Sequence, residues 1–401
     1  MKRQSQVQKR TLLIFLYSFL GKDRIFAILI CSRSQLWRLR ALNSTPSITT
    51  NPIAVSQTLS RAAQLSRDRS RLREAARSTM GAEAGELPRI DFSGVDASAP
   101  GTGRWDATRA QVVDALATFG CFDAHYPALA PAQRATLFDG AVRPLFALPA
   151  DAKRRNHYGP GKPFHGYLGG LPGLHAYESL AIVDGPELGA VQAFADLMFP
   201  AADNAAFCET VRGAAARMAE LEGAVRRMVM EGLGVAVDEA EAQSAPFWHL
   251  FRMSGYGAPT ADEMAREVRY GSHQDTNSLS VVCQHEVDGL EMQARDGRWV
   301  LVRPSPASLV VMAGNALRAW SNDRVHAPFH RISVGGDATR YSAILFSVPG
   351  GPTIRVRDEL VDEAGGRPRR FRDYDYDEFV RFCVSEEGGR HDDKLKACCG
   401  V

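Results

Sequence analysis

The sequence lacks the cysteine patterns of a disulfide framework or a structural zinc site. Its 401 residues include seven cysteines, at positions 31, 121, 208, 283, 383, 398 and 399, without repeated close spacings. Reduced thiols in a cytosolic protein are the simplest interpretation, so we expect a cytoplasmic location. Cys398 and Cys399 are followed by Gly400 and Val401, which do not complete a prenylation motif.

The sequence also lacks an apolar run long enough to span a membrane. Residues 11–20 are apolar, but a charged segment at 21–24 interrupts them, so the run falls short of the roughly 20 residues that a spanning helix needs. Residues 1–79 carry 15 Lys and Arg against 3 Asp and Glu. We expect residues 1–79 to be a poorly structured basic extension. It has three possible origins: an over-extended gene model, a targeting segment such as a plastid transit peptide, or a membrane tether. The first is suggested by Met80, which resembles a natural start. No stable membrane association is expected.

The remainder of the chain lacks the positive charge of a nucleic-acid-binding protein. Residues 80–401 carry 33 Lys and Arg against 43 Asp and Glu, which makes this part mildly acidic. With 45% hydrophobic and 23% charged residues overall, the composition is that of an ordinary globular protein. We expect a monomer that binds a small molecule and no nucleic acid.

The chain does contain a helical front half followed by closely spaced strands. Residues 106–119 and 204–233 have apolar side chains at helical spacing, with Gly120 at the end of the first helix and core methionines in the second. Asp296-Gly297 predicts a hairpin. Strands are predicted at residues 88–92, 279–284, 289–293, 298–302, 308–314 and 340–348. This order predicts an α+β chain with an antiparallel sandwich or barrel.

A metal site is indicated by His273-Gln-Asp275, although His391-Asp-Asp393 has the same form. On a strand, His273 and Asp275 would face the same side and could bind one ion. Two histidines and one carboxylate form the ligand face of a mononuclear non-haem iron site. His326 and His330 lie downstream, and residue types alone leave both open as the second histidine.

Several motifs together resemble those of the plant soluble iron(II)- and 2-oxoglutarate-dependent dioxygenases. They include HQDTNSLSVV, DGLEMQARDGRWVLVRPSP, VVMAGNALRAWSNDRVHAPFHRIS and RYSAILF, preceded by LPRIDF, GCFDAHYP, LFALPADAKRRN and HGYLGG. The resemblance covers about residues 87–401. RNHYGPGKPFHGYLG, YESLAI and VRRMVMEGLGV resemble the AOP-type branch, named for enzymes that modify glucosinolate side chains.

This resemblance implies a double-stranded β-helix, a jelly-roll core with packed N-terminal helices and iron between its two sheets. It divides the chain into an N-terminal, mainly helical region at 87–240, a jelly-roll core at 245–355 and a C-terminal helical tail at 356–401. It also implies His330 as the second histidine, because the family's histidine directly precedes Arg and lies ten residues before an Arg-x-Ser motif. The same test rejects His391.

The implied Fe(II) ligands and catalytic centre are thus His273, Asp275 and His330. Arg340 and Ser342 match the family positions that bind the far carboxylate of 2-oxoglutarate, and a guanidinium is suited to that role. Tyr256 matches a tyrosine that contacts the cosubstrate.

Other matched positions have less defined roles. Tyr167 and the segment 175–179 resemble positions that line the substrate pocket, although ordinary core and loop roles fit equally well. Asn315 replaces the family's usual Asp, which bears on local stability and not on the iron.

The resemblance implies that the protein oxidises a small organic plant metabolite, by hydroxylation or desaturation. It would consume O2 and 2-oxoglutarate, release succinate and CO2, and use ascorbate as a reductant. A hormone such as an auxin or a gibberellin is an alternative substrate. Two other classes are a non-catalytic metabolite-binding jelly roll, against which the intact ligands argue, and a zinc hydrolase, which the 2-oxoglutarate site disfavours.

Overall fold

The computed structural model describes residues 86–171, 174–237, 246–258, 270–333 and 338–401. The predicted basic extension at residues 1–79 lies outside the described residues, so its origin stays a prediction. Within the described ranges, no helix combines the length and the apolar character needed to cross a membrane.

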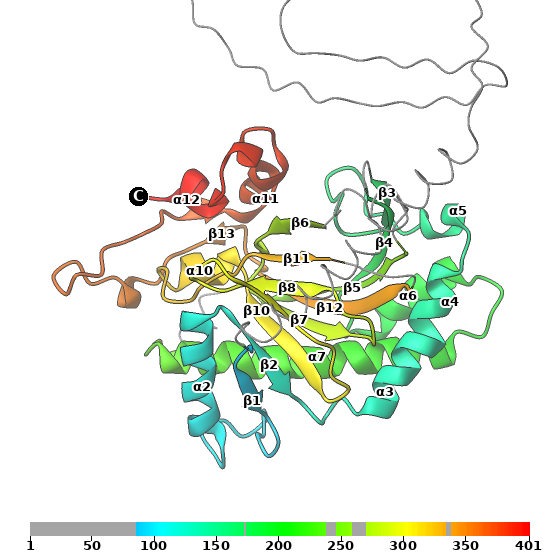
Figure 1. Cartoon of the computed structure of the whole chain (residues 1–401), viewed down its shortest axis with the longest axis horizontal. Helices are drawn as coiled ribbons and strands as arrows, with labels where there is room; N and C mark the ends of the chain where they lie inside the picture. The colour runs from blue at the N-terminus through cyan, green and yellow to red at the C-terminus, as the bar shows by residue number, and fades with distance from the viewer. Residues whose placement is uncertain (1–85, 172–173, 238–245, 259–269, 334–337) are drawn as a thin grey trace, which may run out of the picture. The chain divides into compact units, whose positions relative to one another are not determined.

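Two facing β-sheets form the centre of the described structure (Figure 1). Of the described strand pairs in the larger sheet, only β1–β2 is parallel, and the others are antiparallel. From one edge to the other its eight described strands are β1 (Arg89–Asp91), β2 (Cys121–His125), β10 (Ser308–Ala313), β7 (Leu279–Gln284), β12 (Arg340–Val348), β5 (Trp248–Tyr256), β4 (Leu174–Val183) and β3 (Leu168–Leu171).

The smaller sheet packs on the inner face of the larger one. Its described strands are antiparallel and lie in the order β6 (Tyr270–His273), β11 (His330–Ile332), β8 (Leu290–Gln293) and β9 (Trp299–Leu301). Leu290 and Met292 of this sheet share an apolar cluster with Val282, Val310 and Met312 of the larger sheet. This apolar layer confirms the predicted jelly-roll sandwich in an α+β chain.

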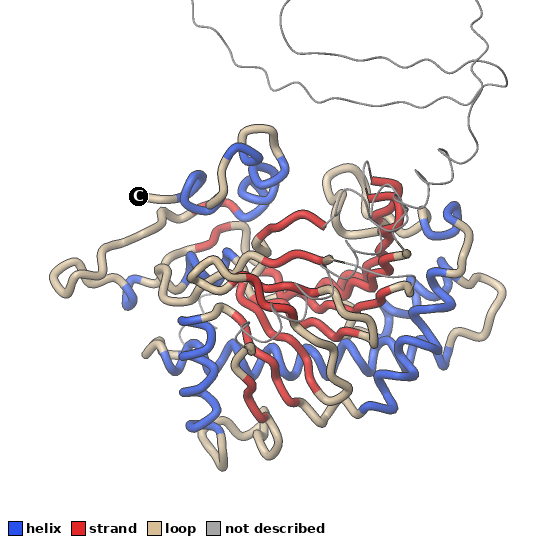
Figure 2. The backbone as a smooth tube through the Cα atoms, in the orientation of Figure 1, coloured by secondary structure: helices blue, strands red, loops and turns tan. Residues whose placement is uncertain are grey.

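Helices cover the outer face of the larger sheet (Figure 2). Met218 and Val225 of the long helix α7 are fully buried in one cluster with Ala343 and Leu345 of β12, so its methionine-bearing stripe is core, as predicted. The described helices before the first iron motif are α2 (Trp105–Thr118), α3 (Pro131–Ala135), the π-helix η1 (Thr136–Val142), α4 (Arg143–Phe146), α5 (Ala150–Lys153), α6 (Leu188–Met198) and α7 (Ala205–Gly232).

The end of α2 fixes the loop that leads to His330. Gly120 follows the helix with a φ of +78°, the left-handed conformation that glycine adopts without strain. A Cβ at Gly120 would lie 2.4 Å from the carbonyl oxygen of His326, so no side chain fits there. The main-chain N–H of His326 donates to the carbonyl of Leu116 at 2.9 Å, which ties the loop to α2.

The register of β12 decides which of its side chains enter the sandwich. Ala343 and Leu345 pack in the helix-facing cluster, while Ile344 packs against the cluster between the sheets. Because strand side chains alternate, Arg340 and Ser342 face the same side as Ile344. Both predicted 2-oxoglutarate contacts on β12 therefore point into the sandwich.

The chain after β12 packs on α10 (Asn315–Trp320). Phe371, Phe379 and Leu395 are fully buried in a cluster with Ala316 and Ala319 of α10. This segment contains β13 (Thr353–Ile354), η2 (Asp358–Leu360), β14 (Tyr374–Asp375), α11 (Tyr376–Val384), η3 (Gly388–Arg390) and α12 (Lys394–Cys399).

The larger sheet is continuous across the boundary expected near residue 240. Its strands β1 to β4 come from the range 87–240, and its other strands come from the range 245–355. The boundaries expected between these ranges, and with the tail at 356–401, stay predictions.

Candidate active site

His273, Asp275 and His330 lie together where the two sheets meet. One ligand atom from each lies within 4.8 Å of the others, and no other such group of His, Cys, Asp or Glu occurs among the described residues. Nε2 of His273 is 3.5 Å, and Nε2 of His330 is 3.6 Å, from Oδ1 of Asp275. Two imidazole nitrogens and a carboxylate oxygen around one point can form one face of an octahedral iron site.

Strand pairing and a turn bring these three side chains together. His330 of β11 is the cross-strand partner of His273 on β6. β6 ends at His273, so the prediction that a shared strand face aligns His273 with Asp275 is wrong, and the turn after the strand places the carboxylate. The carbonyl of Asp275 accepts from the N–H of Asn315 at 2.7 Å, and its Oδ2 accepts from Ser280 Oγ at 2.5 Å.

The surroundings keep Asp275 ionised and His330 neutral, the states that metal binding requires. Burial raises the pKa of Asp275, but His330, His273 and the hydrogen bond from Ser280 outweigh it and hold the pKa well below its usual value. Burial, together with His273, lowers the pKa of His330 to about 4, so its imidazole is neutral at pH 7. At His273, burial lowers the pKa, but the hydrogen bond and charge of Asp275 outweigh it and raise the pKa, so a metal bound there would displace a proton. Nδ1 of His273 lies 2.9 Å from the carbonyl of Gly271, and donation to that oxygen leaves Nε2 able to bind a metal.

The two other candidate histidines lie elsewhere. His326 belongs to the loop tied to α2, and burial, together with Arg295 and Arg318, lowers its pKa to about 4. His391 is exposed and lies 3.1 Å from Glu387. Neither joins the cluster, so the geometry agrees with the choice of His330.

Arg340 presents an unsatisfied positive charge on the inner face of the larger sheet. It is fully buried, and its Nη2 donates to Oε1 of Gln284 at 2.8 Å. Nε and Nη1 of Arg340 and Oγ of Ser342 have no hydrogen-bond partner among the described residues. The ring centroid of Tyr256 is 5.1 Å from Cζ of Arg340. Burial lowers the pKa of Arg340, so an anion that used the orphaned donors would relieve a desolvation cost.

Sequence reasoning missed Ser280 and Gln284, the side chains that hold Asp275 and Arg340. Both lie on β7, four residues apart, so they face the same side of the sheet. A signal existed, since they are the two polar residues of an otherwise apolar strand and lie on the same face. Their partners could not be identified without the register of β7 against β12.

The predicted pocket residues lie on opposite faces of the larger sheet. Tyr167 donates to Glu178 at 2.6 Å and packs against the helix-facing cluster, away from the inner face. Tyr177 is the cross-strand partner of Tyr256, with ring centroids 5.0 Å apart, and its hydroxyl donates to Ser179 at 3.0 Å. Tyr177 and Ser179 thus face the inside of the sandwich, and Tyr167 does not.

Asn315 is buried at the start of α10, where its main-chain N–H holds the turn of Asp275. Its Oδ1 has no hydrogen-bond partner among the described residues. The family's usual Asp would place a charge at this buried position, so the neutral amide avoids a desolvation cost.

Comparisons with known proteins give the family. Residues 249–349 match the 2OG-Fe(II) oxygenase superfamily. The probable 2-oxoglutarate-dependent dioxygenase AOP1 of Arabidopsis thaliana is 37% identical over 307 residues, which cover 76% of this chain and 98% of that protein. The 2-oxoglutarate-dependent dioxygenase AOP3 of the same plant is 28% identical, with 80% of this chain and 99% of that protein covered.

Solved structures give the same fold. The rice dioxygenase for auxin oxidation is 31% identical, with a TM-score of 0.63 over 79% of this chain and all of that chain (100%). The Arabidopsis thaliana dioxygenase for auxin oxidation 1, in its complex with 2-oxoglutarate, is 24% identical with a TM-score of 0.60, over 71% of this chain and 100% of its own. At 24% identity, the similarity to the Arabidopsis thaliana enzyme shows a shared fold alone.

The donor set fits Fe(II) and 2-oxoglutarate, since three hard or borderline ligands converge and a buried guanidinium has donors to spare. The resemblance to an AOP-type enzyme is confirmed, and the two other classes, a non-catalytic binding protein and a zinc hydrolase, are not supported. With 37% identity over 98% of a relative's length, this chain belongs to the 2OG-Fe(II) oxygenase superfamily, as a 2-oxoglutarate- and Fe(II)-dependent dioxygenase.

Proposed function

We propose that His273, Asp275 and His330 are the Fe(II) ligands of this dioxygenase. The convergence of their three ligand atoms within 4.8 Å supports this assignment. When bound there, Fe(II) supplies oxidative chemistry with O2 and 2-oxoglutarate, which is converted to succinate and CO2. The residues orient the metal: Gly271 fixes the tautomer of His273, and Ser280 fixes the rotation of the Asp275 carboxylate.

We further propose that Arg340, Ser342 and Tyr256 bind the far carboxylate of 2-oxoglutarate. The orphaned Nε and Nη1 of Arg340, with the unpartnered hydroxyl of Ser342, offer three donors to two carboxylate oxygens. Gln284 is a positioning residue, because its side-chain oxygen holds Nη2 of Arg340. The full burial of Arg340 keeps water away from this end of the cosubstrate.

The substrate we propose is a small organic acid of plant metabolism. Arg252 faces the same side as Arg340, because Arg252 pairs with Ile344 across β5 and β12. Arg252 is buried, and it donates to Ser179 Oγ at 2.6 Å and to the carbonyls of Gly166 and Phe164, without a carboxylate partner among the described residues. An acidic group on the substrate would offset the burial that lowers the pKa of Arg252.

Two groups of relatives favour different acids. The AOP-type relatives support a specialised metabolite, which is our first candidate. A hormone acid, such as an auxin or a gibberellin, is the second candidate, because the rice dioxygenase for auxin oxidation is 31% identical and wholly covered. Hydroxylation is the proposed default outcome, and desaturation of the same carbon is the alternative.

A substrate panel tests this proposal. The Fe(II)-loaded protein receives 2-oxoglutarate, ascorbate and O2 with plant carboxylic acids, including indole-3-acetic acid and gibberellins, and with their methyl esters. We expect one free acid to increase succinate release and yield an oxidised product in mass spectrometry, while its ester does so much more slowly. Arg252→Gln should reduce this preference and leave the affinity for 2-oxoglutarate unchanged. Equal turnover of acid and ester would exclude an acidic recognition group.

Location and assembly belong to the same proposal. We propose a cytoplasmic monomer, with a plastid location as the alternative if residues 1–79 direct import. Imaging of a fluorescent fusion, made with and without residues 1–79, separates the two locations. Light scattering of the purified protein measures its molar mass, and a dimer would contradict the proposed monomer.

A further inference from the structure

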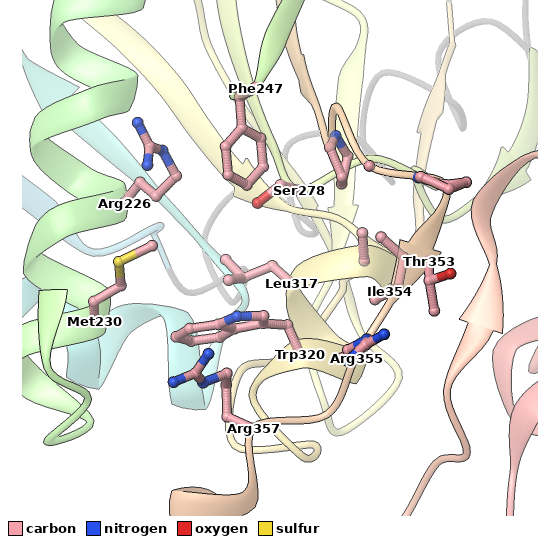
Figure 3. A pocket seen from close by; sticks show the side chains of 14 residues that line it. Arg226, Met230, Phe247, Ser278, Leu317, Trp320, Thr353, Ile354, Arg355 and Arg357 are labelled. Atoms are coloured by element: carbon pink, nitrogen blue, oxygen red, sulfur yellow. The ribbon is translucent and has the colours of Figure 1, made fainter. Parts of the chain in front are cut away.

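The structure contains a cavity of about 600 Å³ (Figure 3) whose described lining includes none of the proposed iron and 2-oxoglutarate ligands. It is bordered by α7, by α10 and by the chain that follows β12. Among the described residues, its apolar wall includes Met230, Phe247, Leu317, Trp320 and Ile354. This volume is within the range of cavities that hold small organic ligands.

The polar side of the cavity is positively charged. Arg226, Arg355 and Arg357 reach it, and none of the described lining residues is acidic. Arg226 already lies 3.3 Å from Glu222, and Arg357 donates to Glu359 at 2.5 Å. Arg355 is exposed and forms no hydrogen bond or ion pair with a described residue. The cavity therefore offers an anion at least one uncompensated guanidinium, with two more close by.

Trp320 gives the apolar wall a hydrogen-bond donor. Its indole ring lies between Arg357 and Leu317 in Figure 3, beside the open space of the cavity. The indole N–H donates to no side chain or carbonyl of the described residues, and a buried or half-buried indole usually finds an acceptor. A ligand with an aromatic body and an acceptor group would use both the ring face and this donor.

We propose that this cavity is a second binding site, for an organic anion with a flat apolar body. The body packs against Met230, Phe247 and Trp320, and the anionic group meets Arg355 at the rim. An aromatic carboxylate or sulfonate has this chemistry.

Occupancy of this site is compatible with a filled iron site. None of the proposed ligands of iron or 2-oxoglutarate lines the cavity, although Ser278, three residues after Asp275, does. The two sites also share α10: its first residue, Asn315, holds the carbonyl of Asp275 at 2.7 Å, and its last residue, Trp320, lines the cavity. The second site therefore contacts the helix that supports the iron site.

The test uses the full chain loaded anaerobically with Fe(II) and saturating 2-oxoglutarate. The probe is 8-anilinonaphthalene-1-sulfonate, an aromatic anion that fluoresces strongly in apolar pockets. We expect saturable binding of one probe per chain, with energy transfer from tryptophan that Trp320→Phe reduces. The uncharged analogue N-phenyl-1-naphthylamine lacks the sulfonate, and we expect it to bind at least about tenfold more weakly, the factor that 1.4 kcal/mol represents.

Two variants change the cavity without touching the iron site. Arg355→Gln should weaken probe binding by roughly threefold to tenfold, as expected for a partly exposed charge. Thr353→Trp places an indole on the exposed rim and should abolish binding. Arg89→Gln is the matched control, an exposed arginine of β1 that does not line the cavity, and it should leave the affinity unchanged.

Melting temperatures and 2-oxoglutarate titrations verify that each variant is folded. Several results would overturn the proposal: no probe binding to the wild type, equal binding by both variants and the wild type, or equal affinity for the charged and uncharged probes. Probe binding that occurs only when 2-oxoglutarate is omitted would show that the probe occupies the iron site instead.

Discussion

Arg340 and Arg318 are both buried, but their surroundings are opposite. Arg318 of α10 donates from Nε to Asp323 at 2.7 Å, and from Nη1 and Nη2 to the two oxygens of Asp393 at 3.1 and 2.9 Å. Burial alone lowers the pKa of Arg318, but the two carboxylates outweigh it and raise the pKa. Among the described residues, Arg340 has one hydrogen-bond acceptor, the neutral side chain of Gln284, and burial lowers its pKa.

This difference separates a structural charge from a ligand-binding charge. Asp393 is the N-cap of α12, so its pairing with Arg318 joins the C-terminal segment to α10. The protein completes the hydrogen bonds of Arg318 itself, and breaking such a buried pair is destabilising. At Arg340 the donors stay incomplete, and a buried unsatisfied polar group costs free energy until a ligand supplies the partner.

The largest expected effect in the ligand-binding region is loss of the metal. Asp275→Ala removes one of three proposed ligands and should lower the affinity for Fe(II) by more than about 100-fold, beyond the usual effect of an outer-shell change. Metal analysis of the purified variant and succinate release measure this loss. His326→Ala is the control and should retain iron, because His326 lies outside the cluster. Stoichiometric iron in His330→Ala, with none in His326→Ala, would show that the wrong histidine is assigned.

Arg340→Gln tests the other half of the ligand-binding region. The change removes the charge and two donors, so the affinity for 2-oxoglutarate should fall by a factor of about 30 to 1000, the equivalent of roughly 2 to 4 kcal/mol. Iron content should not change, because Arg340 is not a ligand. Titration of 2-oxoglutarate into the anaerobic Fe(II) protein, followed by charge-transfer absorption, measures the affinity. An unchanged affinity would contradict the role of Arg340.

The melting temperature of the ligand-free protein distinguishes Arg340 from Arg318 most clearly. Arg340→Gln should not lower the melting temperature of the ligand-free protein, because it removes a buried charge that no described carboxylate pairs. A large drop in melting temperature would mean that Arg340 is structural, like Arg318.

The sequence predicted the parts of the site that lie in contiguous motifs. The family resemblance implied His330 by its position ten residues before Arg-x-Ser, and it matched His273 and Arg340 by the motifs that contain them. A change of hydrophobic period near residue 245 indicated an α+β chain with a sandwich or barrel, and the resemblance implied the jelly roll. The cause of the His273–Asp275 alignment was not predictable, because an alternating pattern cannot reveal that β6 ends at His273. The residue types alone, a carboxylate two residues after a histidine, did not select the pair, because His391-Asp-Asp393 has the same form; the surrounding family motifs selected it.

The unpredicted parts depend on partners far apart in the sequence. Gln284 reaches Arg340, 56 residues away, and Arg318 reaches Asp393, 75 residues away. No periodicity links such pairs, since strand register and helix packing bring them together. His391-Asp-Asp393 illustrates the limit: it has the form of a metal site, the family resemblance rejected it, and the role of Asp393, which caps a helix and pairs with Arg318, was not predicted.

Among the changes to the pairing of Arg318 with the C-terminal segment, Arg318→Gln should be the most destabilising. It leaves Asp323 and Asp393 without their cation, and breaking a largely buried pair costs about 2 to 4 kcal/mol of the free energy of unfolding, reduced here because both carboxylates are partly exposed. Chemical denaturation of the iron-free protein measures this loss. The control is Arg303→Gln, which breaks an exposed pair with Asp288 at 3.5 Å and should have little effect. If Arg318→Gln also lowered the affinity for 2-oxoglutarate, the distinction between a structural and a ligand-binding arginine would be contradicted.

Asp393→Asn should have a smaller effect than Arg318→Gln, because it removes one charge and keeps the cap. Asp393 accepts from the N–H of Lys396 at 3.1 Å, and an asparagine oxygen can do the same at an N-cap. We therefore expect a loss of about 1 kcal/mol in the free energy of unfolding at pH 7, from the weakened pairing with Arg318. Denaturant titration measures it, and a loss as large as that of Arg318→Gln would mean that Asp323 contributes nothing.

The pH dependence of this loss identifies its origin as the charge on Asp393. Burial raises the pKa of Asp393, but the hydrogen bonds and charge of Arg318 outweigh it and lower the pKa below its unfolded value. A carboxyl group with a depressed pKa stabilises the fold fully above its unfolded pKa, about 3.9, and this contribution is lost as the pH falls through the folded pKa. The difference in unfolding free energy between the wild type and Asp393→Asn should therefore be constant from pH 7 to 5 and shrink below about pH 4. A difference that stays constant down to acid unfolding would assign the loss to altered packing of the amide, because only the ionised carboxylate of Asp393 pairs with Arg318.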